Sequence, residues 1–366
     1  MTRRVGFLGY GFMGTAHANA LARLRMFFPD APETERAILI GRDEAALARA
    51  ADRLGFAETR TDWRDAIDDV DVLYNLGPNH LHADPSIAAL QADTHVLCEK
   101  PLAQDHAAAD RMATAARESD ARAAIGFVYR YVPALQLAKS LVDDGTIGEV
   151  REVRVQYLQD WLRDPEAPWS WRLDADLAGS GALGDLGSHA FDLLRWLVGD
   201  LAAVSGHRRT FVDERPDPEG DGRLPVTVDD AFSAQVRFEG GATGTVEASR
   251  VAAGHKNDLR IAVHGSRGSL RFGLERLNEL AVCGPEDRGY ERVLVTDPDD
   301  PYVDAWWPPG HALGWEHAFV HQSYAFLDAV ASDAPYRPTF QDGLAVQQAL
   351  GAVAESAATG EWQVVD

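Results

Sequence analysis

Cysteines, lysines and long apolar runs are scarce in this chain of 366 residues. Two cysteines, Cys98 and Cys283, are too few for a disulfide framework or a metal-ligand cluster, so we expect two small core residues in a reducing, cytoplasmic setting. No run approaches the roughly 20 apolar residues of a membrane helix, so we expect no bilayer-spanning segment. The N-terminus passes from Arg3 and Arg4 directly into an apolar strand, which predicts that no signal peptide is present.

Basic residues are also in the minority, because 57 acidic residues stand against 35 basic ones and the formal net charge is -22. A negative field of this size repels phosphate backbones, so we expect neither nucleic acid nor an anionic membrane as a partner. The acidity fits both a solvated surface that follows a coding bias and an adaptation to high salt, where screening relieves self-repulsion. Hydrophobic residues make up 46% and charged residues 25%, which is typical of a folded, globular chain.

The first third of the chain alternates apolar strand patterns with helical ones. Strands are predicted at 5–8, 37–40, 71–74, 94–98 and 123–128, and helices around 16–24, 44–54, 85–90 and 107–118. This alternation predicts a parallel sheet wound on both faces, as in a Rossmann dinucleotide-binding domain. We assign this domain to residues 1–124.

After about residue 148 the pattern changes to a two-residue period separated by glycine-rich turns. The alternating segments are 150–158, 232–238, 242–248, 259–264 and 269–272. They predict a large, mostly antiparallel open sheet with one buried face. Helices are expected at 183–198, 317–331 and 343–358, and a polar loop at 208–229.

The fold class is therefore α/β plus α+β, and we assign residues 125–366 to a second domain, whose expected roles are substrate binding and oligomerisation. The broad face of the predicted sheet suits self-association, so we expect a homodimer or homotetramer.

A glycine fingerprint follows the first predicted strand and opens the first helix. Gly9, Gly11 and Gly14 match the G-x-G-x-x-G pattern within a βαβ unit. The first glycine allows a tight turn, the second lets a pyrophosphate approach the backbone, and the third permits close helix–strand packing. The alternative is that the glycines serve only the turn.

Cofactor choice depends on the end of the second predicted strand. NAD enzymes usually carry an acidic residue there, whereas this chain has Gly41, Arg42 and Asp43. A small residue followed by arginine leaves room for a 2′-phosphate and donates to it, which favours NADP. NAD stays open, because Asp43 is able to accept from the ribose hydroxyls.

The segment Cys98-Glu99-Lys100-Pro101 follows another predicted strand, at the sheet edge where ligands bind. The chain has only three lysines, so a lysine at this edge is notable. Pro101 would fix the turn, and a cis bond is one way to do so. The alternative is an ordinary surface lysine.

Asp185 and His189 are four residues apart and Asp192 follows by three, so the three are expected on one helical face after a glycine-rich segment at 179–184. An Asp–His pair beside a lysine suits proton abstraction from an alcohol. Metal binding by these residues is a weaker reading, because no cysteine or second histidine stands at ligand spacing. A solvated or capping histidine is the other alternative.

Together these motifs resemble the Gfo/Idh/MocA oxidoreductases, and the resemblance extends to Gly77-Pro78-Asn79-His80-Leu81-His82 and to Arg130. It implies a catalytic trio of Lys100, Asp185 and His189. The cofactor-binding set that it and the fingerprint imply is Gly9, Gly11, Phe12, Met13, Gly14, Arg42, Asp43, Pro78, Asn79, His82, Glu99 and Lys100.

A subgroup of this family, the levoglucosan dehydrogenase-like sugar dehydrogenases, is similar at 157–161, 170–172 and 179–185. The substrate-binding set implied is Lys100, Arg130, Gln159, Trp161, Arg172, Asp185, Ser188 and His189. Trp161 would serve as a sugar platform, and Trp169 and Trp171 would be further platforms; core packing is the alternative for each of the three. The chain departs from the family at Gly77, where threonine is frequent, and at Gly41, where an acidic residue is expected for NAD.

We therefore expect an NAD(P)-dependent oxidoreductase that moves a hydride between a nicotinamide and a secondary hydroxyl of a sugar, anhydrosugar or cyclic polyol. His189 would be the general base, Lys100 would stabilise the developing negative charge, and Asp185 would orient substrate or base. No metal is needed. Two alternatives stay open: a non-catalytic dinucleotide or sugar sensor, and redox-neutral glycoside cleavage through transient oxidation.

Overall fold

The computed structural model describes residues 2–365, and contacts divide this chain into two units. The first unit comprises the chain up to Tyr131 together with Gly314–Leu344. The second comprises Val132–Leu313 and the chain from Ala345 onward. No pattern in the sequence indicated that 314–344 belongs with the first unit. The functional boundary expected between residues 124 and 125 stays a prediction.

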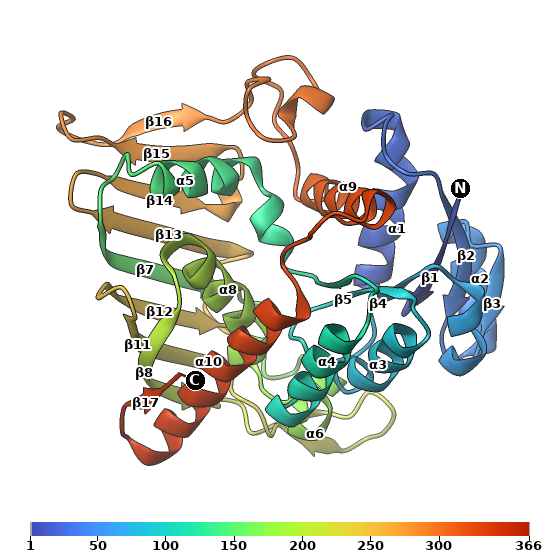
Figure 1. The fold of residues 1–366 in the computed structure, drawn as a ribbon. Coiled ribbons are helices and arrows are strands. Elements are labelled where there is room, and N and C mark those ends of the chain that lie inside the picture. Colours follow the sequence, from blue (N-terminus) through green and yellow to red (C-terminus); the bar gives the residue numbers. More distant parts are fainter. Residues whose placement is uncertain (1, 366) are drawn as a thin grey trace. The chain divides into compact units, whose positions relative to one another are not determined.

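The first unit contains a six-stranded parallel sheet in the order β3-β2-β1-β4-β5-β6, counted within the described residues (Figure 1). The strands are β1 (Arg3–Leu8), β2 (Thr34–Ile40), β3 (Glu58–Arg60), β4 (Val72–Asn75), β5 (His95–Cys98) and β6 (Ala123–Ile125). The strand order reverses between β1 and β4, which is the switch point beside which doubly wound sheets bind ligands. The predicted Rossmann fold is confirmed.

Helices of the first unit begin and end near their predicted positions. They are α1 (Phe12–Phe27), α2 (Glu44–Leu54), α3 (Ala83–Gln91), α4 (His106–Glu118) and α9 (His317–Ser332), which packs against α1. In α2 the Asp43 carboxylate accepts the Ala46 N–H at 2.9 Å, and Gly55 ends the helix in the left-handed region at φ 74°.

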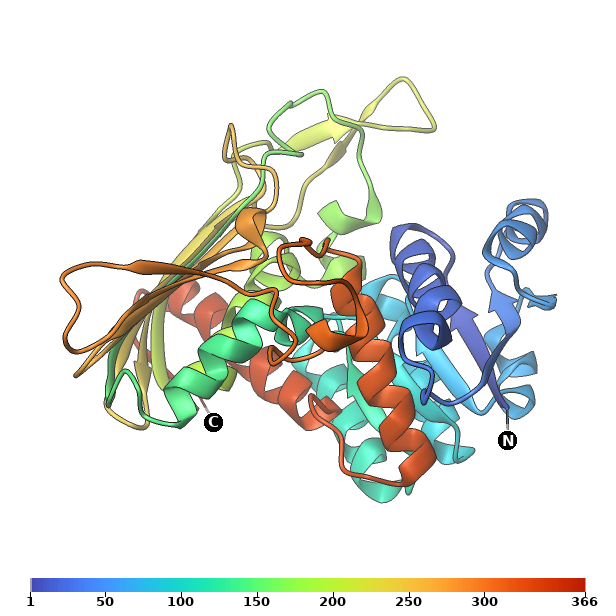
Figure 2. The ribbon, with the colours of Figure 1, turned by 90° about the horizontal axis from the view of Figure 1, so that it is seen from above.

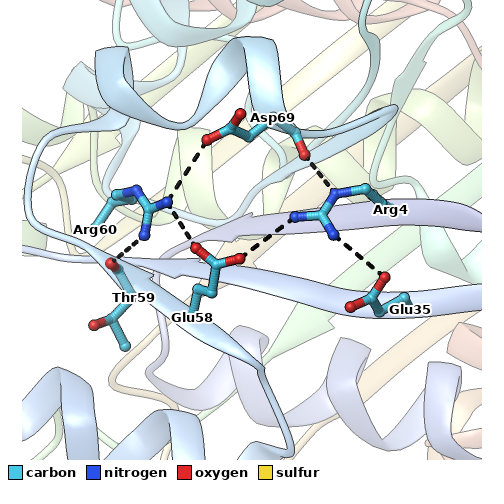
Figure 3. Close-up of polar contacts among 6 residues, drawn as sticks. All are labelled: Arg4, Glu35, Glu58, Thr59, Arg60 and Asp69. Atoms are coloured by element: carbon cyan, nitrogen blue, oxygen red, sulfur yellow. Dashed lines mark hydrogen bonds and ion pairs between the residues drawn. The ribbon is translucent and has the colours of Figure 1, made fainter.

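An exposed ion-pair network, the Arg4–Arg60 network, joins β1, β2, β3 and the segment before β4 (Figure 3). Arg4 lies 3.4 Å from Glu35 and 3.7 Å from Glu58, measured between guanidinium nitrogen and carboxylate oxygen. Arg60 lies 2.7 Å from Glu58 and 3.6 Å from Asp69. The hydrogen bond from Arg60 lowers the pKa of Glu58.

The second unit contains a nine-stranded sheet in the order β16-β15-β14-β13-β7-β12-β11-β8-β17 (Figure 1). Its strands are β7 (Val150–Leu158), β8 (Leu201–Arg209), β11 (Ala231–Phe238), β12 (Thr243–Ser249), β13 (Asp258–Gly265), β14 (Ser269–Gly273), β15 (Glu279–Cys283), β16 (Glu291–Leu294) and β17 (Gln363–Val364). Within the described chain every neighbouring pair in this sheet is antiparallel except β7 and β12. The mostly antiparallel sheet is confirmed.

Helices gather on one face of this sheet (Figure 2). They are α5 (Pro133–Asp143), α8 (Gly187–Val198) and the part of α10 (Phe340–Thr359) that belongs to this unit; the short α6 (Ala175–Ala178) and α7 (Ala182–Asp185) precede α8. Side chains of β11 alternate strictly between buried and exposed, as a sheet with one covered face requires. The other face carries a shallow hollow of about 810 Å³.

Three expectations are corrected by the structure. The polar loop at 208–229 contains a hairpin of β9 (Glu214–Pro216) and β10 (Arg223–Pro225), held by fully buried Arg215, which donates to the carbonyls of Leu162 and Asp164 at 2.7 Å each. The helix expected at 183–198 is divided between α7 and α8 at Leu186. Cys283 is half-buried on β15 and is not a core residue, whereas Cys98 is buried as expected.

None of the helices within residues 2–365 combines the length and the apolar character needed to cross a bilayer.

Candidate functional site

The glycine fingerprint lies at the carboxyl end of β1, next to the end of β4. Gly9 has φ 106°, and a Cβ there would lie 2.7 Å from the Leu76 carbonyl oxygen. A Cβ on Gly14 would lie 2.7 Å from the Gly9 oxygen, whereas a Cβ on Gly11 would meet nothing within 4 Å. Gly11 caps α1 without a side-chain hydrogen bond. The loop therefore packs closely against backbone at Gly9 and Gly14 and leaves free space at Gly11. That space fits a pyrophosphate at a helix N-terminus that no side chain caps.

The end of β2 has no space for an acidic side chain at position 41. A Cβ on Gly41 would lie 2.3 Å from Cε1 of Tyr10, so the tyrosine ring occupies that space. Arg42 is exposed and makes no hydrogen bond or ion pair with the residues that the structure describes. Asp43 is partly engaged as the N-cap of α2. Arg42 therefore keeps all of its side-chain donors available to a ligand, whereas the Asp43 carboxylate already accepts a hydrogen bond.

Two buried side chains, Asn75 and His82, hold the loop after β4 in place. Asn75 donates through Nδ2 to the carbonyls of Leu81 and His82, each at 3.0 Å. His82 is fully buried, and its Nδ1 and Nε2 lie 2.8 Å from Pro101 O and 3.0 Å from Gly77 O. Burial lowers the pKa of His82, against the hydrogen bonds to Pro101 and Gly77. His82 therefore joins two loops through both ring nitrogens, and its expected contact with the cofactor stays a prediction.

The Lys100 loop follows β5, and the Lys100–Pro101 bond is cis, one of the alternatives considered from the sequence. Glu99 is buried; its Oε1 lies 2.9 Å from Nε2 of His17, and its Oε2 accepts the Lys100 N–H at 3.2 Å. Both Glu99 oxygens thus have partners inside the protein, so Glu99 supports the loop. Lys100 is half-buried and Asn79 is buried; Pro78 begins the short 3-10 helix at Asn79–Leu81.

In the second unit, Asp185 is positioned by a buried aspartate that sequence reasoning missed. Asp229 accepts the Gly181 N–H at 3.0 Å and the Leu183 N–H at 2.8 Å, and so caps the helix that ends at Asp185. A Cβ on Gly181 would lie 1.8 Å from the Asp229 carbonyl oxygen. The glycine-rich segment before Asp185 was the sequence signal for this close approach.

His189 lies in the first turn of α8 and is buried to 7% exposure. Its ring lies 6.2 Å from the ring of Tyr157 on β7, measured between centroids. Asp192 is buried at 1% exposure, whereas Asp185 is half-buried. The Ser188 hydroxyl donates to the Gly184 carbonyl and is fully buried, so it stabilises the turn between α7 and α8, and nothing in the structure supports the expected substrate contact.

Polar and aromatic side chains after β7 lie close to one another. Asn257 Oδ1 accepts from Gln159 Nε2 at 2.9 Å and from the Tyr157 hydroxyl at 2.7 Å. Trp161 is 44% exposed, and the guanidinium carbon of buried Arg250 lies 5.7 Å from its ring centroid. Gln159 and Trp161 thus lie on one stretch of chain, with Trp161 offering an open ring face.

Arg250 is a second buried residue that no sequence pattern indicated. It donates to the Asp229 carbonyl at 3.0 Å and to the Arg172 carbonyl at 3.4 Å. Burial lowers the pKa of Arg250, opposed first by the charge of Asp185. Arg172 itself is exposed, with its guanidinium 4.5 Å from the Trp171 ring.

Two further candidates have structural partners. Trp169 is half-buried, packs against a small apolar cluster that contains Leu162 and Leu173, and donates to Pro225 O at 3.0 Å. Arg130 is buried in the first unit, 3.6 Å from the Asp342 carboxylate. Burial alone would raise the pKa of Asp342, but Arg130 lowers it. The contact shown for Arg130 is thus an internal ion pair.

The structure therefore gathers the predicted residues into two groups, one in each unit. In the first unit the glycine loop, the loop after β4 and the Lys100 loop meet at the carboxyl edge of the sheet. In the second, the start of α8 adjoins the end of β7. Between residues 2 and 365, no three His, Cys, Asp or Glu side chains are grouped as metal ligands would be.

Comparison with known proteins identifies the family. Residues 3–127 match the oxidoreductase family with an NAD-binding Rossmann fold, and residues 135–271 match the GFO/IDH/MocA C-terminal domain. Levoglucosan dehydrogenase from Pseudarthrobacter phenanthrenivorans is 39% identical, over 98% of this chain and 97% of that protein.

Solved structures agree over the whole chain. An oxidoreductase domain protein from Kribbella flavida is 49% identical with a TM-score of 0.96, and both chains are fully covered. A levoglucosan dehydrogenase in complex with NADH and levoglucosan is 38% identical with a TM-score of 0.97, also with full coverage of both. The motifs, the fold and these likenesses together place the chain in the Gfo/Idh/MocA family of NAD-binding oxidoreductases.

Proposed function

We propose that this chain is a dehydrogenase that oxidises a secondary hydroxyl of a sugar, anhydrosugar or cyclic polyol with NAD(P). The observation that carries the proposal is the likeness to levoglucosan dehydrogenase over 98% of the chain. The donors and acceptors of Gln159, Asp185 and His189, beside the exposed ring of Trp161, suit a ligand with several hydroxyl groups.

The glycine loop fits a dinucleotide, because the open space above Gly11 leaves backbone N–H groups accessible. A bound nicotinamide would accept the hydride, and that chemistry is the cofactor's own. We propose that Arg42 binds the 2′-phosphate of NADP. Its exposed, unpaired guanidinium within the described chain and the Tyr10 ring against Gly41 support this preference. NAD remains the alternative, and the levoglucosan dehydrogenase structure contains NADH.

The chain's own residues would handle the proton and the charge. His189 takes the proton of the substrate hydroxyl as general base. The Lys100 ammonium donates a hydrogen bond to the same oxygen and stabilises its negative charge as the C–H bond breaks. Asp185 orients the substrate or the base, held in place by the Asp229 cap.

Gln159, Trp161 and Arg172 are the substrate contacts that we propose in the second unit. Trp161 would stack on the apolar face of a sugar ring, while Gln159 and Arg172 bind hydroxyls. Arg130 and Ser188 stay predicted substrate contacts, and the structure gives each an internal partner, Asp342 and the Gly184 carbonyl.

We also propose a homodimer or homotetramer formed through the face of the nine-stranded sheet that α5, α8 and α10 leave open. Its shallow hollow is lined by polar side chains such as Gln156, Glu247 and Arg260. A reducing, cytoplasmic location is proposed on the two free cysteines.

A spectrophotometric screen tests the function. The protein is incubated with levoglucosan, glucose or myo-inositol and with NAD or NADP in parallel, at low and at high salt. Net reduction of the dinucleotide by at least one of them is expected, faster with NADP. Arg42→Ala should abolish that preference by raising the KM for NADP and not for NAD. Dinucleotide binding without any reduction would overturn the proposal and favour a sensor; glycoside cleavage without net reduction would favour the redox-neutral reaction.

A further inference from the structure

A buried histidine on the cofactor helix contacts the loop of the proposed catalytic lysine. His17 lies on α1, three residues after the last glycine of the fingerprint, and its side chain is fully buried. Its Nε2 lies 2.9 Å from Oε1 of Glu99, a residue 82 positions later in the chain. The contact joins the helix that begins at the glycine loop to the end of β5.

The other oxygen of Glu99 continues this chain of contacts. Oε2 accepts the backbone N–H of Lys100 at 3.2 Å. The carboxylate is also closed in by backbone, since a Cβ on Gly126 would lie 3.0 Å from it. Glu99 therefore has little freedom to move once His17 holds it.

The orientation of His17 is set by aromatic neighbours. The ring of His17 makes edge contacts with Phe7, Tyr74 and Phe319, at centroid distances of 6.4, 5.3 and 5.1 Å. Nδ1 is buried and has no hydrogen-bond partner among residues 2–365. A buried N–H without a partner is costlier than a bare ring nitrogen among aromatic edges, so the proton belongs on Nε2, which donates to Glu99.

We propose that His17 is a positioning residue that acts through Glu99 to fix the backbone of Lys100. The inference rests on the proposed function, because it takes Lys100 as the group that stabilises the substrate oxygen. A displacement of about 1 Å at a reacting group costs about 100-fold in rate. Loss of the His17 donor leaves the Glu99 carboxylate buried with one partner fewer, and the Lys100 loop then shifts.

The chain has only three lysines, so the side-chain signal of Lys100 can be followed directly. In protein labelled with ¹³C at the ε-carbon of lysine, three signals are expected, from Lys100, Lys139 and Lys256. Lys139 pairs with Asp143 and Lys256 with Asp160, and neither contacts His17, so both serve as internal controls. Lys100→Met assigns the Lys100 signal. The isosteric but donor-free His17→Leu should move or broaden that signal alone, and His17→Gln, which restores a donor, should return it. A folded His17→Leu with an unchanged Lys100 signal would overturn the proposal.

Kinetics separate a positioning role from a structural one. His17→Leu should lower kcat about 10- to 100-fold while the Kd for the dinucleotide changes less than about threefold. In the Lys100→Met background the same substitution should cause no further loss of kcat, because its effect passes through Lys100. A loss of equal size in both backgrounds would contradict the proposal. If the unaltered protein oxidises no sugar, the proposed function fails, whereas the lysine signals still decide whether His17 positions Lys100.

Discussion

Two groups of charged and polar side chains in the first unit differ in what they contribute. The Arg4–Arg60 network has several ion pairs, but Arg4 is 39% and Glu58 44% exposed (Figure 3). The His17–Glu99 contact is a single pair with side-chain exposures of 0% and 7%. Water and salt screen the exposed charges, whereas the buried pair has no alternative partners.

Burial, and not the number of contacts, therefore decides which polar groups this fold depends on. The exposed network lies on β1–β3 and the segment before β4, and each of its charged side chains is able to exchange its partner for water. The buried groups, such as Asn75 and His82, hold backbone carbonyls of the loops at the carboxyl ends of strands. Replacing a buried polar side chain should therefore change function or folding. Replacing a member of the exposed Arg4–Arg60 network should not.

The largest effect is expected at buried His189. His189→Ala should lower kcat about 100- to 10,000-fold, because a positioned general base contributes about this factor. The Kd for the dinucleotide, measured by nicotinamide fluorescence, should stay within about threefold. Retained turnover in a folded variant would show that His189 is not the general base and that a buried polar group of this site can be lost without effect.

Acid should destabilise the protein through buried His321. Its Nδ1 lies 2.9 Å from the Tyr131 carbonyl, and burial lowers its pKa from 6.5 to about 3. Above pH 6.5 both the folded and the unfolded state keep it neutral, so stability is complete. Between pH 6.5 and 3 only the unfolded state binds the proton, and stability falls by about 1.4 kcal/mol per pH unit.

Urea unfolding followed between pH 7 and 4 measures this slope. His321→Gln should make it shallower by one proton, while the exposed His106→Gln serves as the matched control and should leave it unchanged. Equal slopes in all three proteins would mean that His321 is not the group that binds the proton.

The close contact between the backbones of Gly181 and Asp229 is expected to be nearly as sensitive to substitution as the buried side chains. Gly181→Ala should destabilise the protein by about 3 kcal/mol, because its Cβ would lie 1.8 Å from the Asp229 carbonyl oxygen. Gly240→Ala is the matched control, since nothing lies within 4 Å of its Cβ position. Calorimetry that finds the two variants equal would show that the capped turn before Asp185 adapts freely.

The smallest effect is expected in the exposed network. Glu58→Gln removes the carboxylate shared by Arg4 and Arg60. The Tm should stay within about 1 °C of the unaltered protein, and 1 M salt should not enlarge the difference. A decrease of more than about 5 °C would mean that the exposed network stabilises the fold as much as a buried pair does.

Much of the fold was predictable because local patterns carry it. The alternating pattern at 150–158 predicted the strand β7, and the glycine fingerprint predicted the turn into α1. Both predictions were possible because the residues that form these elements are neighbours in sequence. Asn75, Arg250 and Asn257 were not predicted as site residues. Each is a single polar residue whose partners lie 6 to 100 positions away, and no periodicity marks such a pair.

The two kinds of sheet, the dinucleotide loop and the residue types of the candidate site could be predicted from the amino-acid sequence. Each follows from side-chain periodicity or from the backbone freedom of glycine, which are local properties. Packing between distant segments decided that His82 holds two loops together and that buried Asp229 caps the turn before Asp185. These outcomes depend on which groups lose their water when distant segments pack, and burial of that kind is a property of the folded chain.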